Sequence, residues 1–113
     1  MELLLIIEDH FLITGRGIFV IPWLDYPENW RFKPFSDKVV LRKPDGTEEH
    51  CFVSFIVERV HFSYGGSNTH IVLQFPEGTK EKIPIGSHVF VSKEILRKLH
   101  RGMPNKLDLT NSS

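Results

Sequence analysis

Short runs of apolar residues, separated by turn signals, make up most of this chain. The longest run covers residues 49–62, where Val53, Phe55 and Val57 fall on one face at a spacing of two and Ser54 and Glu58 fall on the other. This alternation is typical of a β-strand with one buried face. Shorter strand-like runs occupy residues 3–7, 18–21, 39–42, 70–75 and 83–91.

The turns between these runs have a clear chemical basis. Lys43-Pro44-Asp45-Gly46-Thr47 combines a proline, which presets φ at the first turn position, with a glycine that accepts a positive φ. Pro76-Glu77-Gly78-Thr79 repeats this combination. Six short strands with turns at such intervals, and no long helical pattern between them, predict an all-β barrel or sandwich rather than parallel βαβ units.

One helix is predicted after the last strand. Ser92 can cap its start, Ile95 and Leu99 form an apolar stripe, and Gly102 can end it. The residues beyond it read as a frayed end. The sequence thus divides into a β-barrel domain at 1–91, a helix packed on the barrel at 92–103, and a tail at 104–113.

The composition is that of one folded domain. The 113 residues are 41% apolar and 25% charged, and the 14 basic and 14 acidic residues cancel. A neutral protein has no bulk field that attracts nucleic acid or anionic lipid. The longest apolar stretch near the start ends at Glu8, far short of the about 20 residues of a membrane span, and no secretory signal precedes it. We predict a cytoplasmic protein.

The stretch from Glu8 to Gly17 reads EDHFLITGRG and resembles the start of domain II of elongation factor Tu and related translational GTPases. That family has the pattern E-D-x-F-x-I-x-G-R-G followed by a β run, here residues 18–21. Two shorter stretches, at 34–41 and 85–90, resemble later segments of the same domain. The resemblance implies a closed six-stranded β-barrel.

The resemblance also implies a binding surface. In the family, matching residues lie at or near the pocket for the terminal adenosine and amino acid of aminoacylated transfer RNA. Carried over, Glu8 and Asp9 would be polar contacts, and Phe11, Ile13 and Phe19 an apolar surface for a base. The residues alone leave a second interpretation open: Phe11 and Ile13 alternate and can point into the barrel, and the acids and Arg16 can be hairpin residues that bind nothing.

The chain departs from the family in two respects. It has no GxxxxGK[ST] phosphate loop, so we expect neither GTP binding nor GTP hydrolysis. It also carries an aromatic loop after residue 21, which suits stacking on unpaired bases, a protein interface, or a plain cap on one mouth of the barrel. The loop residues predicted to contact a partner are Trp23, Tyr26, Trp30, Arg31 and Phe32.

Catalytic and metal chemistry are not favoured. The six histidines show no H-x-H or H-x-x-x-H spacing, and the single cysteine, Cys51, excludes an internal disulfide and lies in a strand with an apolar face. Adjacent acids such as Glu8 and Asp9 point to opposite faces of a strand and cannot work as a pair. We therefore expect no catalytic residue, no cofactor and no metal site.

Two functions remain for a small neutral domain of this kind. The first is a non-catalytic module that binds RNA, such as a transfer RNA end or ribosomal RNA, or a translation component. The second is a module that binds a protein, such as a bacterial immunity protein or antitoxin that neutralises a toxin by blocking it. The sequence leaves the oligomeric state open.

Overall fold

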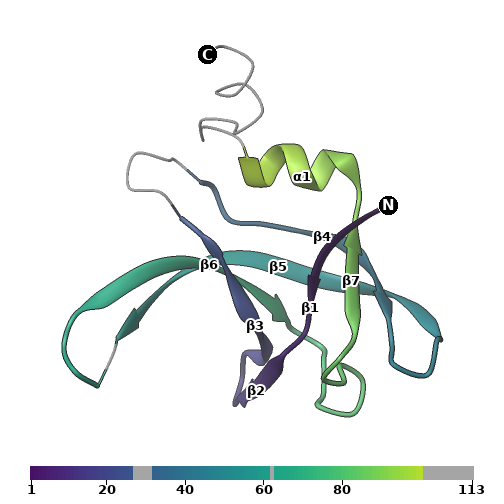
Figure 1. Ribbon diagram of the computed structural model, residues 1–113, viewed down its shortest axis with the longest axis horizontal. Helices are drawn as coiled ribbons and strands as arrows, with labels where there is room; N and C mark the ends of the chain where they lie inside the picture. The colour runs from purple at the N-terminus through teal and green to yellow at the C-terminus, as the bar shows by residue number, and fades with distance from the viewer. Residues whose placement is uncertain (27–31, 62, 101–113) are drawn as a thin grey trace.

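The computed structural model describes residues 1–26, 32–61 and 63–100 and shows one strongly curled sheet with a helix over one open end (Figure 1). The seven strands are antiparallel and lie in the order β1-β7-β4-β5-β6-β3-β2. The elements are β1 (Glu2–Ile6), β2 (Asp9–Ile13), β3 (Gly17–Asp25), β4 (Phe35–Arg42), β5 (Glu48–His61), β6 (Ser67–Phe75), β7 (His88–Val91) and α1 (Lys93–His100).

The all-β class with one short helix is confirmed, but the closed six-stranded barrel is wrong. The sheet is a curled half-barrel of seven strands, with β1 and β2 at the two ends of the strand order. The chain bends between them. The Ile7 amide donates to the Ser87 carbonyl at 2.8 Å, and the Glu8 amide donates to the Ile21 carbonyl at 2.8 Å. One N-terminal segment therefore follows β7 first and then crosses to β3.

The inner face of the curl holds the core. Leu41 of β4, Val53 and Phe55 of β5 and Leu73 of β6 are completely buried there. These are the alternating apolar positions, and the residues between them face outward. The last predicted run is shorter than expected, since β7 begins only at His88 and residues 83–87 form a turn.

The helix closes one end of the core. The Ser92 hydroxyl accepts a hydrogen bond from the Ile95 amide at 3.2 Å, as an N-cap does. Ile95 and Leu99 are 1% and 4% exposed and belong to the same buried cluster as the inner face of the sheet. Lys98 lies with its ammonium group 5.0 Å from the centre of the Phe35 ring. No helix among the described residues is long and apolar enough to cross a membrane.

Candidate functional site

The residues of the family-like motif lie on β2, at one end of the sheet, and on β3 beside it. β2 pairs with β3 in five successive residue pairs, among them Phe11 opposite Phe19 and Ile13 opposite Gly17. Phe11 and Ile13 are 44% and 38% exposed, so the interpretation that they point into the barrel is wrong. The physical reason is the register of β2 with β3: Phe11 lies opposite Phe19 on the outer face, whereas Ile18 and Val20 of β3 face the core. Glu8 and Asp9 are also exposed.

Phe19 shares a face with Phe11 but is covered. It is only 6% exposed, and the Arg16 guanidinium lies 4.7 Å from the centre of its ring. The same guanidinium donates to Glu58 of β5 at 2.8 Å. The structure thus brings Phe11, Ile13 and Phe19 to one outer face, where the first two are open to a partner and the third lies beneath Arg16.

The glycines of the motif shape this hairpin. The Arg16 amide donates to the Ile13 carbonyl at 2.9 Å, and Gly15 within that turn has a φ of 79°. Gly17 has a φ of 93°, and a Cβ atom there would lie 2.3 Å from the Phe75 carbonyl oxygen. The first glycine is needed for its backbone angle, the second also for close approach to β6.

A polar groove lies at the opposite end of β3. The pairing of β3 with β6 stops at Asp25 opposite His70, whereas the pairing of β5 with β6 continues to His61 opposite Ser67. Figure 1 shows β5 and β6 running on past β3 as a two-stranded ribbon. The groove in this corner has a volume of about 590 Å³ and is lined by Asp25, Tyr26, Arg59, Ser67, Asn68, Thr69 and His70.

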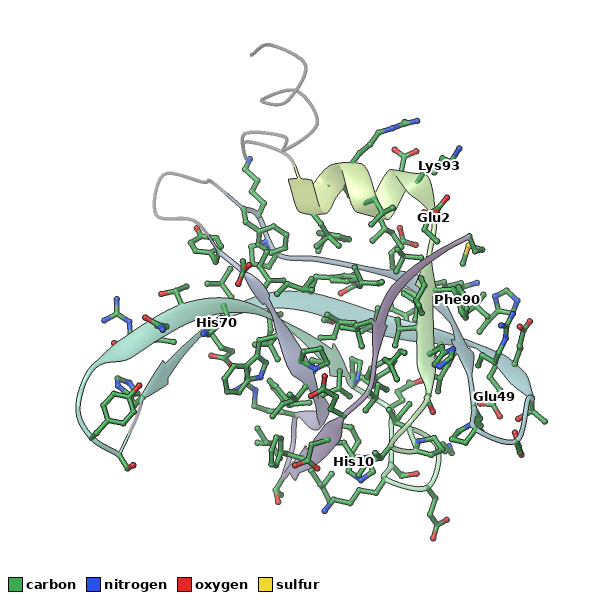
Figure 2. The ribbon with its side chains drawn as sticks, viewed as in Figure 1. Glu2, His10, Glu49, His70, Phe90 and Lys93 are labelled. Carbon is green, nitrogen blue, oxygen red and sulfur yellow. The ribbon has the colours of Figure 1, made fainter. Side chains whose placement is uncertain are left out.

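His70 marks the inner end of the groove (Figure 2). The centre of its ring lies 5.1 Å from that of Trp23, with 36° between the ring planes. The Nδ1 atom of His70 is buried and has no hydrogen-bond partner among the described residues. A buried polar atom without a partner is costly, and a bound ligand or water commonly satisfies it.

The residues of the aromatic loop are distributed over two places. Tyr26 lines the groove, and Trp23 packs against His70 at its inner end. Phe32 is 8% exposed, belongs to the core and packs against Phe35, whose ring in turn stacks on Phe55 at 4.7 Å. The structure therefore does not bring Phe32 to the groove. Trp30 and Arg31 lie outside the described residues.

The remaining reactive side chains are placed as follows. Cys51 is half-buried on β5, and burial raises the pKa of its thiol. It borders a second hollow of about 190 Å³ whose other lining residues include His50, Glu77 and Lys82. In the described ranges no three His, Cys, Asp or Glu side chains are grouped closely enough to hold a metal ion. His10 makes a hydrogen bond through Nδ1 to the Ile83 carbonyl at 2.7 Å.

Of the residues that line the groove, sequence reasoning named Tyr26 and did not name Asp25, Arg59, His70 or residues 67–69. These residues meet because β3 ends before β6 does, and the length of one strand relative to its neighbour is a long-range property. The only local signal was the long β5 run, which exceeded every other run in the chain.

A scan against protein-family models, a search of curated proteins and a search of solved structures each found no match for this chain.

Proposed function

We propose that this protein is a non-catalytic protein-binding module that holds an extended polypeptide segment in the groove beside β6. One observation carries the proposal. Residues 67–69 pair with β5 on one side, and no described strand pairs with them on the β3 side. Among the described residues no strand takes up their backbone N–H and C=O groups on that side, so a guest strand could pair with them. Adding a strand to an open sheet edge is a common way to bind a peptide.

The side chains of the groove would supply specificity. Arg59 offers a planar guanidinium that suits a carboxylate, and Asp25 offers a carboxylate that suits a lysine or arginine. Ser67, Asn68 and Thr69 add hydroxyl and amide groups. A guest segment with opposite charges a few residues apart matches this lining. The unpartnered Nδ1 of His70 would gain a hydrogen bond from the same guest.

The charges around the exposed surface of β2 favour a protein partner over RNA. The exposed acids Glu8 and Asp9 precede Phe11, and Glu58 already forms an ion pair with Arg16. A surface that binds RNA needs cations that are free to meet phosphates. RNA binding at β2 is the second candidate, supported by the resemblance of this segment to domain II of elongation factor Tu and by the exposure of Phe11. Toxin neutralisation is one role that a protein-binding module could serve.

Selection of random peptides tests the proposal. Peptides displayed on phage are selected against the wild-type protein alone. A selected peptide, labelled with a fluorophore, should bind the wild type and bind Arg59→Glu at least tenfold more weakly. Arg97→Glu is the matched control, because Arg97 is an exposed arginine on α1.

Labelled single-stranded RNA is titrated in parallel. Enrichment of no peptide, or equal binding of the selected peptide to wild type and Arg59→Glu, contradicts the proposal. Tight RNA binding that Phe11→Ala abolishes would support the second candidate instead.

A further inference from the structure

We infer that the guest strand of the groove carries an acidic and a basic residue at neighbouring positions, the acid beside Arg59 and the base beside Asp25. The inference rests on the proposed function, because it names the charge pattern of the segment that the groove binds. Its starting point is a pair of opposite charges that line one groove and do not meet. Among the described residues neither Arg59 nor Asp25 forms an ion pair, whereas Arg16, Arg42 and Lys43 each bond a glutamate.

The strand registers explain why these two charges stay apart. Arg59 lies opposite Thr69 in the pairing of β5 with β6, and Asp25 lies opposite His70 in the pairing of β3 with β6. Residues that lie opposite each other in antiparallel strands share a face, and neighbouring residues of one strand point to opposite faces. Because Thr69 and His70 are neighbours, Arg59 points to one face of the sheet and Asp25 to the other.

Packing against the core identifies the two faces. Val57 lies two residues before Arg59 on β5 and packs against the core, so Arg59 continues the inner face of the curl. Leu24 also packs against the core, so its neighbour Asp25 continues the outer face. The groove therefore offers a cation on its inner face and an anion on its outer face.

A guest strand that continues the line of β3 along β6 meets both charges. Its residue opposite Thr69 lies on the inner face, with only the short Thr69 side chain between it and Arg59. Its next residue lies opposite Asn68 on the outer face, two positions from Asp25 along the same line, which is about 7 Å.

The spacing of charges in the guest follows from this geometry. An acid and a base at neighbouring positions point to opposite faces, so the acid reaches Arg59 and the base reaches Asp25. Two charges separated by one residue point to the same face and leave one charge of the groove without a partner. Covering an unpaired charge costs free energy, so the groove selects the first pattern against the second.

Fluorescence anisotropy with two labelled peptides tests the pattern. Both are short threonine peptides with one glutamate and one lysine, which are neighbours in the first peptide and separated by one threonine in the second. Their composition and net charge are therefore the same, and the wild type should bind the first at least fivefold more tightly. Equal affinities that Arg59→Glu weakens alike would overturn the inference and leave the proposed function intact. The inference also fails if neither peptide binds, and the phage selection then decides the proposed function separately.

Charge reversal assigns each charge to its partner. Asp25→Lys should weaken binding of the first peptide at least tenfold, and a peptide with glutamate in place of its lysine should restore the affinity. Arg59→Glu should instead be rescued by a peptide with lysine in place of the glutamate. Arg97→Glu is the matched control, because Arg97 is exposed on α1 and does not line the groove. Rescue of both variants by the same peptide, or of neither by any peptide, would refute the assignment.

Discussion

Replacing Ile95 by alanine tests how much of the stability depends on the contact between α1 and the sheet. Ile95 is 1% exposed and lies within the main core cluster. The substitution removes three carbon atoms from a buried site, and each is worth about 0.8 kcal/mol of transfer free energy, which makes about 2.4 kcal/mol. The cavity left behind adds to this, and measured changes of this type cost about 2–5 kcal/mol.

Equilibrium unfolding in urea, followed by tryptophan fluorescence, measures the effect. The free energy of unfolding falls by about 1–3 kcal/mol per molar urea for small proteins, so a loss of about 3 kcal/mol lowers the midpoint by about 1–3 M. Arg97→Ala is the control on the same helix. Its side chain is exposed, and we expect a change within about 0.5 kcal/mol. Equal midpoints for Ile95→Ala, Arg97→Ala and wild type would show that α1 does not contribute to the core and would refute the reasoning.

Three further predictions concern single sites. Gly17→Ala should destabilise the protein by about 2 kcal/mol or more, because the added Cβ would collide with the Phe75 carbonyl. Gly15 has open space around it, so Gly15→Ala should cost only about 1 kcal/mol, which comes from its positive φ. Equal melting temperatures of the two variants would contradict this reasoning. The hydrogen bond from the Thr47 hydroxyl lowers the pKa of Asp45, so the turn gains stability above the ordinary aspartate pKa and loses it as the pH falls through the lowered pKa. In an NMR titration, Thr47→Val should move the pKa of Asp45 upward. An unchanged pKa in that variant would count against this cause. Burial raises the pKa of the Cys51 thiol, so at neutral pH the thiol should react with a disulfide reagent more slowly in the folded protein than in the urea-unfolded chain. Similar rates in the two states would show that the thiol is accessible to the reagent in the folded protein.

The sequence was most informative where the structure is local. The turn at residues 43–47 forms as its proline and glycine indicate, with a hydrogen bond from the Gly46 amide to the Lys43 carbonyl. The alternation in β5 correctly separates buried Val53 and Phe55 from outward-facing Ser54. The cap at Ser92 involves only the four residues from Ser92 to Ile95. Each of these features depends on neighbouring residues alone.

Features that depend on distant pairing could not be predicted. The alternation of Phe11 and Ile13 looks like that of a buried strand, and only the register of β2 with β3, which puts Phe11 opposite Phe19 on the outer face, explains their exposure. The groove depends on a register shift in β3 between Val20 and Leu24, which changes where β3 stops along β6. A local sequence pattern predicts neither the strand order nor a register shift.

The pairing of β1 with β7 has a consequence for synthesis of the chain on the ribosome. β1 is made before every other strand of the sheet, yet its pairing partner β7 is the last strand of the sheet, with Glu2 opposite Val91. At about 5–20 residues per second, β1 waits several seconds for that partner. Contacts between such distant residues also slow folding after release. During this interval β1 lacks the strand that pairs with it in the folded sheet, and its apolar side chains stay open to contacts that the native structure does not contain.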